Sequence, residues 1–243
     1  KDAVSAGTLY FVMSHLGTAF IIVSFLVFAS YTNSFEFLSF YNIGDILPPE
    51  IKNMLFIFLL IGFGPKASIF PMHIWLPTTH SSSPSNVSSL LSGVGTKTGI
   101  FMIIRVVFQF LGVSETWWGL LLVVLGCISA VMGILYANVE KNIKQIVAYS
   151  SIENVGIITI ALGTSIVFIS LGQNALGTLA LIAGLLHVLN HSLFKGGLFL
   201  GIGSITYATK SKDIESLADL LKGCQRHLYS SLSSFLLPHV FRP

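Results

Sequence analysis

The chain has 243 residues, of which 53% are hydrophobic and only 9% are Asp, Glu, Lys or Arg, about a third of the charged share of a typical soluble domain. So few charges cannot cover the surface of a soluble domain, and the mean hydropathy of +0.82 indicates that lipid is the solvent. The formal net charge of +3 gives no indication of a nucleic-acid partner. Cys127 and Cys224 are too few for a disulfide framework, a zinc site or an iron–sulfur cluster, so we do not expect this chain to carry out electron transfer itself.

Apolar stretches of about 20 residues predict six membrane spans. They cover residues 7–30, 51–70, 87–111, 117–138, 143–169 and 176–205. We therefore expect an all-α fold, a polytopic bundle of about six transmembrane helices. The first ten residues have no feature of a signal peptide and Lys1 is not an initiator Met, so we expect the chain to begin inside a longer protein.

The basic residues of the connections predict the orientation of this bundle. If the N-terminus lies on side A, that side also holds most of the lysines: Lys1, Lys141, Lys144, Lys210, Lys212 and Lys222. Side B holds Lys52, with Arg105 as a further candidate and Trp117 and Trp118 as an interfacial anchor. Because Lys and Arg accumulate on the inner side of a membrane, side A is predicted to face the cytoplasm.

The second span contains Lys66 among helix-breaking residues, Gly62, Gly64, Pro65 and Pro71. A charge at the bilayer centre costs about 2.5 to 3.5 kcal/mol, and the carbonyls that a proline frees must find protein or water. A broken helix beside a lysine is typical of ion sites in secondary transporters. The alternative is a kink that serves packing alone.

The third span contains Lys97 between Gly93, Gly95 and Gly99, with Arg105 further along. Small residues allow neighbouring helices to approach closely and leave room for water. Lys97 is therefore a candidate proton-relay residue. The alternative for both cations is a side chain that extends along the helix to the membrane surface.

Glu153 is the only acidic residue within a predicted span. An isolated buried carboxyl group would be protonated at neutral pH, whereas one beside a lysine would be ionised. Glu153 is thus either a charge partner of a lysine or a member of a proton relay.

The last span carries His187, His191 and Lys195 at intervals of four residues. A helix places all three along one stripe, with successive members about 6 Å apart. Imidazole and a desolvated ammonium group can both exchange protons near neutral pH, so the stripe is a candidate proton relay. A hydrogen-bonded structural pair of histidines and a metal-binding pair are the alternatives, although no carboxylate or Cys accompanies the histidines.

Several motifs in a fixed order over about residues 3–222 resemble the antiporter-like proton-channel subunits of respiratory complex I and of group 4 membrane-bound hydrogenases. They are 65–77 (PKASIFPMHIWLP), His80, 83–85, 97–99, Arg105, 142–151 (NIKQIVAYSS) and 187–196 (HVLNHSLFKG). The form of 151–156 (SIENVG) most resembles the branch of hydrogenase-4 component B and formate hydrogenlyase subunit 3.

This resemblance implies that the six spans are family helices six to eleven. It implies that Lys66 lies on a broken seventh helix and pairs with a glutamate of the fifth, that Lys97 lies on the eighth, and that the His187 to Lys195 stripe lies on the eleventh. The implied function is proton translocation in a redox-driven complex of the hydrogenase-4, formate hydrogenlyase or NADH:quinone oxidoreductase kind.

The resemblance also implies the setting of the chain. We expect a prokaryotic inner membrane, further membrane and peripheral subunits as partners, and quinone, iron–sulfur clusters or a nickel–iron centre in those partners. A structural anchor for soluble redox subunits, a Na⁺/H⁺ antiporter subunit and a quinone-binding membrane oxidoreductase are the alternatives.

The chain departs from the family pattern at both ends. The fifth-helix glutamate and the broken twelfth helix lie outside it, so we expect residues 1–222 to be the middle of a proton-translocating domain that would not pump alone. Residues 223–243 do not follow the family pattern. One choice of codons for residues 224–229, read one base earlier, encodes a Met-Pro sequence like that of the family. We therefore hypothesise a frame-shifted or truncated gene end.

Overall fold

The computed structural model describes residues 2–214 and 216 of the chain. The α-helices are α1 (Asp2–Thr32), α2 (Pro49–Ala67), α3 (Trp75–Ser82), α4 (Ser85–Leu90), α5 (Thr96–Arg105), α6 (Thr116–Val139), α7 (Ile143–Ser170) and α8 (Asn174–Thr209). Short 3₁₀ turns η1 (Phe37–Phe40) and η2 (Ile43–Asp45) and π-helical turns η3 (Leu91–Gly95) and η4 (Val106–Leu111) complete the described part. The expected all-α fold is confirmed. The tail at 223–243, Lys1 and Lys222 lie outside the described residues.

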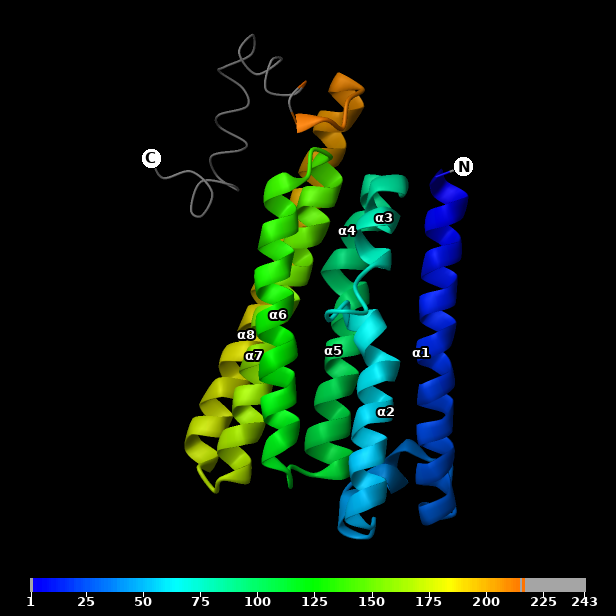
Figure 1. Ribbon diagram of the computed structural model, residues 1–243, viewed down its shortest axis with the longest axis vertical. Coiled ribbons are helices and arrows are strands. Elements are labelled where there is room, and N and C mark those ends of the chain that lie inside the picture. Colours follow the sequence, from blue (N-terminus) through cyan, green and yellow to red (C-terminus); the bar gives the residue numbers. More distant parts are fainter. Residues whose placement is uncertain (1, 215, 217–243) are drawn as a thin grey trace.

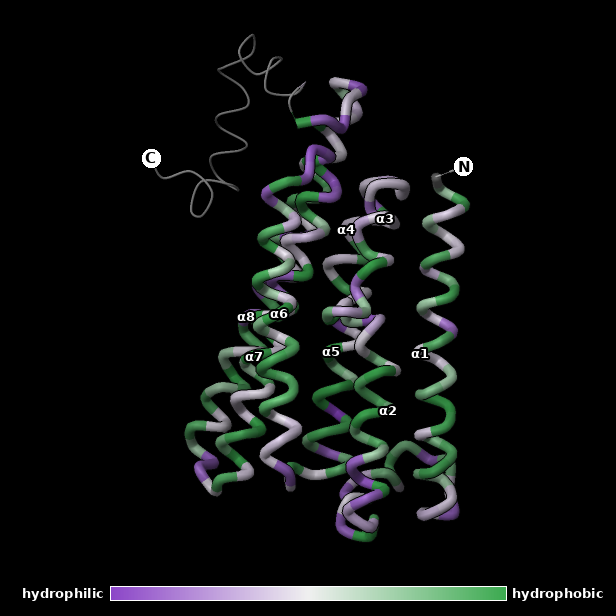
Figure 2. Tube along the Cα trace, viewed as in Figure 1, coloured by the Kyte–Doolittle hydropathy of each residue, from purple (hydrophilic) through white to green (hydrophobic). Residues whose placement is uncertain are grey.

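The long helices run side by side and alternate in direction (Figure 1). In the described part of the chain, five helical stretches are long and apolar enough to cross a membrane, namely 3–32, 85–111, 116–139, 143–170 and 174–209. The sixth expected span is α2, which is 19 residues long and carries Glu50, Lys52 and Lys66 towards its two ends. Figure 2 shows that apolar residues follow the bodies of the helices and that hydrophilic residues gather at the two ends of the bundle.

We call the end of the bundle that holds the N-terminus, α3 and the α6–α7 connection end A, and the opposite end, with residues 33–48, end B (Figure 1). Lys144 and Lys212 both donate hydrogen bonds to carbonyls of the segment around α3, so they lie at end A. A short backbone bridge between Asn142 and Asp213 joins the α6–α7 connection to the segment after α8. The predicted gathering of lysines on one side therefore corresponds to end A.

Glycines set the close contact between α6 and α7. Gly119, Gly126 and Gly133 recur every seven residues of α6, a spacing that keeps them on one face. A Cβ atom at Gly126 would lie 2.8 Å from the carbonyl oxygen of Gly156, and one at Gly133 would lie 2.6 Å from the backbone nitrogen of Glu153. Small residues at such an interface let the backbones meet and gain dispersion contacts without a hydrophobic driving force.

The predicted break in the second span is confirmed. Helix α2 contains Pro65 and ends at Ala67, and the next residue, Ser68, adopts a left-handed conformation with φ of 65°. The indole Nε1 of Trp75 donates to the Pro65 carbonyl at 2.7 Å, and the Phe70 backbone N–H donates to Ser129 Oγ at 2.9 Å. Side chains from α3 and α6 thus satisfy backbone groups that the break leaves free, as the hydrocarbon environment requires.

The half of the bundle towards end B has a dense apolar core. Phe28 and Phe40 pack around Phe110 with ring centroids 6.0 and 6.2 Å from it. Below the break, α2 and α5 fill their interface with large side chains, among them Leu59 and Ile103. In this half of the bundle, the described helices therefore leave little room for water.

We predict that Gly126→Ala destabilises the protein, because the added methyl group would overlap the α7 backbone. Overpacking of this kind costs about 1 to 3 kcal/mol, more than the gain of about 1 kcal/mol in helix propensity. Gly201→Ala on α8 is the control, since no atom lies within 4 Å of its added methyl group. Thermal unfolding in detergent should show a lower midpoint for Gly126→Ala alone, and an equal or higher midpoint would contradict the packing argument.

Candidate functional site: a buried lysine and histidine cluster

Lys97 lies at the start of α5, and 8% of it is exposed. Its ammonium group donates to the Ser92 carbonyl at 2.5 Å and to Thr96 Oγ1 at 3.2 Å. Ser92 belongs to the π-helical turn η3, and π-turns change the regular backbone hydrogen-bonding pattern and recur at functional sites. The local helix distortion thus coincides with the carbonyl that holds the lysine.

Lys195 of α8 is 1% exposed and is held by α7. Its ammonium group donates to the Val147 carbonyl at 3.1 Å and also contacts Ser150 Oγ. The same carbonyl accepts the Ser151 hydroxyl at 3.0 Å. The ammonium groups of both lysines are therefore held by uncharged carbonyl and hydroxyl oxygens.

A pair of serines connects the two lysine sites. Ser92 Oγ and Ser151 Oγ lie 2.9 Å apart, and both side chains are fully buried. The chain of contacts runs from Lys97 through Ser92 and Ser151 to the Val147 carbonyl and Lys195. It ties α5 and α8 to α7 by hydrogen bonds in the middle of the bundle.

His191 is fully buried beside these lysines. Lys97 and Lys195 both act on it electrostatically, and no protein group in the described part of the chain hydrogen-bonds to either ring nitrogen. Its ring stacks on His187 with centroids 6.3 Å apart, the separation expected for one helical turn, and His187 Nε2 lies 3.1 Å from Asn154 Oδ1. Buried polar atoms almost always have a partner, and at a polar site a buried water can supply one.

His80 is a further member of the cluster. In the sequence it is marked only by the family resemblance and not by helical periodicity. It lies in α3, stacks on Phe199 of α8 at 4.6 Å and is fully buried, with neither ring nitrogen bonded to a described protein group. Lys195, Lys144 and Lys97 are the charged groups that act on it. Lys144 donates to the Ser83 carbonyl at 3.0 Å, so this lysine of end A lies close to the segment that carries His80.

Lys66 lies in the last turn of α2, half-buried, and donates to the Tyr10 hydroxyl of α1 at 3.3 Å. Its neighbour Ala67 packs against α5, because a Cβ atom at Gly99 would lie 2.6 Å from the Ala67 nitrogen. The segments that carry Lys66 and Lys97 are therefore in direct backbone contact, as the small residues around Lys97 predict.

Glu153 and Arg105 have different surroundings. Glu153 is partly buried on α7 and interacts electrostatically with Lys195, whereas the Lys195 hydrogen bonds go to other groups. The Arg105 guanidinium lies 5.2 Å from the Tyr41 ring centroid and 5.5 Å from that of Phe37, both in the connection at end B. Arg105 thus extends towards the end B connection, in line with the alternative of a side chain that reaches towards the membrane surface.

The metal-binding alternative finds no support in the described residues, where no group of three or more His, Cys, Asp or Glu side chains could hold an ion. The serine pair could not be predicted, since nothing in the sequence marks two serines on different helices as neighbours. Lysine, histidine and hydroxyl groups are the side chains that the site brings together.

Comparison with known proteins identifies the family. The profile described as "NADH:quinone oxidoreductase/Mrp antiporter, TM" matches residues 1–237. Hydrogenase-4 component B of Escherichia coli K12 is 41% identical over 224 residues, 91% of this chain and 33% of that protein. Formate hydrogenlyase subunit 3 of the same organism is 45% identical over 163 residues, 67% of this chain and 27% of that protein.

A solved structure agrees with these sequence relatives. A chain of the membrane-bound sulfane sulfur reductase, an archaeal respiratory membrane complex, superposes with a TM-score of 0.74 and 27% identity, covering 87% of this chain and 35% of that chain. The present chain thus spans about a third of the length of the first curated relatives it matches. It is an integral, multi-pass membrane protein and belongs to the NADH:quinone oxidoreductase/Mrp antiporter transmembrane family.

Proposed function

We propose that this chain is the central part of a proton-translocating subunit in a redox-driven membrane complex of the hydrogenase-4, formate hydrogenlyase or NADH:quinone oxidoreductase kind. The observation that carries the proposal is the pair of buried lysines whose ammonium groups are held by uncharged oxygens. A purely structural buried cation is normally paired with an anion, because an unpaired one is costly. A lysine that gives up its proton removes that cost.

Each member of the cluster has a role in this proposal. Lys97 and Lys195 accept and release protons, and His191, which both lysines influence, passes protons between them through water. The Ser92–Ser151 hydroxyl pair holds the turn that binds Lys97 against the helix that binds Lys195. Charging either lysine opposes charging the other, since the two repel in a medium of low dielectric constant.

Lys66, His187 and Glu153 extend the cluster. Lys66 would sense a charge partner supplied by another segment, and His187 continues the stripe of α8 towards Asn154. Glu153 would offset part of the Lys195 charge. Because the aromatic and aliphatic core near end B leaves little room for water, protons would enter this part of the protein from end A. His80 and Lys144 are the members of the site nearest to end A. Because lysines gather there, we take end A as the cytoplasmic side.

Redox chemistry is assigned to other subunits. Quinone, iron–sulfur clusters or a nickel–iron centre would lie in those partners, and the cluster would respond to their charge changes through the row of lysines. A structural anchor would need no titratable groups in its interior, so the substitutions below separate it from the proposal.

We predict that Lys97→Met in the assembled complex lowers proton pumping at least tenfold, because losing one relay step raises the barrier by more than about 1.4 kcal/mol. Electron transfer, measured in the same preparation with an uncoupler present, should keep most of its rate. Lys52→Met, at the start of α2, is the charge-matched control. A wild-type rate of proton pumping in the Lys97→Met variant would contradict the proton-relay proposal and favour the structural anchor.

A second prediction concerns the hydroxyl pair. Ser151→Ala removes the group that joins Ser92 to the Val147 carbonyl, and a lost hydrogen bond of about 1 kcal/mol corresponds to a roughly fivefold slower pumping rate. Ser165→Ala is a matched control, since this buried serine of α7 has no hydrogen-bond partner in the described structure. Pumping assays of both variants should separate them. Equal rates would show that the serine pair has no part in the relay.

A further inference from the structure

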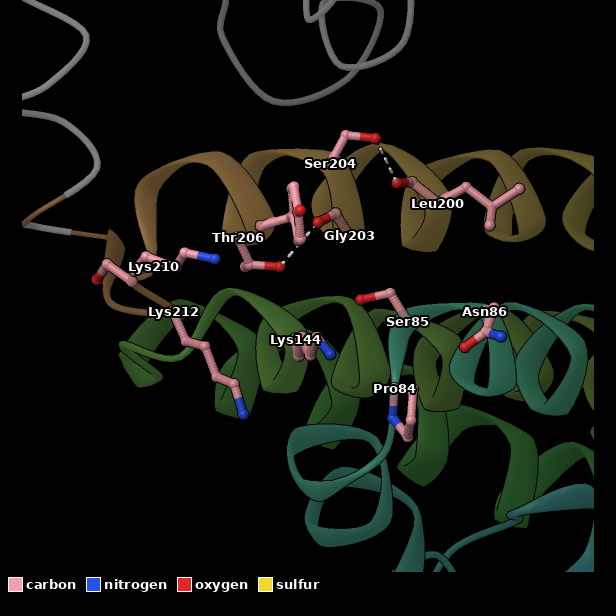
Figure 3. A pocket seen from close by; sticks show the side chains of 12 residues that line it. Pro84, Ser85, Asn86, Lys144, Leu200, Gly203, Ser204, Thr206, Lys210 and Lys212 are labelled. Carbon is pink, nitrogen blue, oxygen red and sulfur yellow. Dashed lines mark hydrogen bonds between the residues drawn. The ribbon is translucent and has the colours of Figure 1, made fainter.

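One cavity of the described structure lies at end A, and neither Lys97 nor Lys195 lines it. It measures about 750 Å³ and lies between the start of α4, the start of α7 and the end of α8. Figure 3 shows Lys144, Lys210 and Lys212 towards one end of it and Ser85 and Asn86 towards the other. Its size falls within the range of small-molecule sites.

The cavity is strongly cationic. Three of its twelve lining residues are lysines, and none of the twelve is acidic. The ammonium groups of Lys144 and Lys212 each donate one hydrogen bond to a carbonyl, of Ser83 and Ser81 respectively. An ammonium group has three donors, so each lysine keeps donors for a ligand. The remaining lining groups include hydroxyls and an amide, which also bind phosphate oxygens.

The cavity also continues into an apolar surface. On α8, Leu200 lines the cavity and is 53% exposed. Leu193 and Leu189, about two and three helical turns further into the bundle, are 69% and 57% exposed. Tyr207, at the cavity itself, is 78% exposed, and tyrosine is typical of the membrane interface. A cationic pocket at the interface that leads to an apolar ridge matches a molecule with an anionic head and an acyl chain.

We propose that this cavity binds the phosphate headgroup of an anionic phospholipid, whose acyl chain lies along the exposed leucines of α8. Lys210 and Lys212 supply the attraction, and Ser85 and Asn86 bind the polar part of the head. The backbone around these lysines is held independently of their side chains, because the Ile143 N–H donates to the Lys212 carbonyl at 2.9 Å. The lipid would fasten the end of α8 to the starts of α4 and α7.

The test compares lipid retention by the native full-length protein in its complex. Delipidated protein is placed in nanodiscs of phosphatidylcholine with about 20 mol% phosphatidylglycerol, a level at which surface lysines still attract anionic lipid. The protein is then released, and its bound lipid is counted by native mass spectrometry. Lys210→Gln/Lys212→Gln should retain phosphatidylglycerol roughly tenfold less than wild type, since each lysine near a membrane surface adds to anion binding.

The matched control is Lys52→Gln/Lys141→Gln, which removes the same charge from lysines that do not line the cavity. It should retain the lipid as the wild type does, and so should Lys210→Arg/Lys212→Arg. Equal retention by the Gln pair and the control pair would overturn the proposal.

Two further experiments distinguish lipid from free phosphate and give a result that does not depend on the folding of the lysine variants. Pure phosphatidylcholine nanodiscs with inorganic phosphate should give no bound phosphate, and phosphate retained there instead of lipid would overturn the lipid assignment. Wild-type protein treated with a phosphatidylglycerol that carries a photoreactive headgroup should be labelled on peptides that contain Ser85 or 203–212. Labelling confined to other segments would overturn the proposal even if the lysine variants fail to fold.

Discussion

The structure depends on one constraint: an ammonium group within a bilayer must find its hydrogen-bond acceptors inside the protein. Lys97 finds the Ser92 carbonyl in a π-helical turn, and Lys195 finds the Val147 carbonyl and the Ser150 hydroxyl of α7. These acceptors are neutral, so each lysine can lose its proton and leave behind no unpaired anion. The same environment explains the break in α2, where the Trp75 indole satisfies the Pro65 carbonyl.

The packing of the helices places these acceptors where the lysines need them. Helix α7 contacts α6 through glycines on one side, and its other side carries Ser150, Ser151 and Asn154, whose side chains meet residues of the neighbouring elements. Close backbone contact on the α6 side thus leaves the polar side of α7 for α8 and η3. The apolar core towards end B separates this polar layer from the far side of the membrane, so a charge inside the layer acts chiefly on its neighbours within the bundle.

Much of the fold could be predicted, because lipid imposes long apolar spans and glycine and proline mark a break near Lys66. The stripe from His187 to Lys195 follows from helical periodicity. Other features could not be predicted from patterns. The π-turn at Leu91–Gly95, the Ser92–Ser151 pair and the Tyr10 partner of Lys66 arise from contacts between residues far apart in the chain. His80 entered only through family resemblance, since a single histidine in a short helix has no periodicity to mark it. The roles of the site residues stay predictions.

The most direct test of the central claim is whether the buried lysines change protonation state as the complex works. Infrared difference spectra of the assembled complex, recorded at rest and during turnover, would be compared between unlabelled protein and protein with nitrogen-15 lysine. The account predicts isotope-sensitive ammonium bands that change on turnover and that shrink separately in Lys97→Met and Lys195→Met variants. Bands that are the same at rest and during turnover, or that persist in both variants, would contradict it.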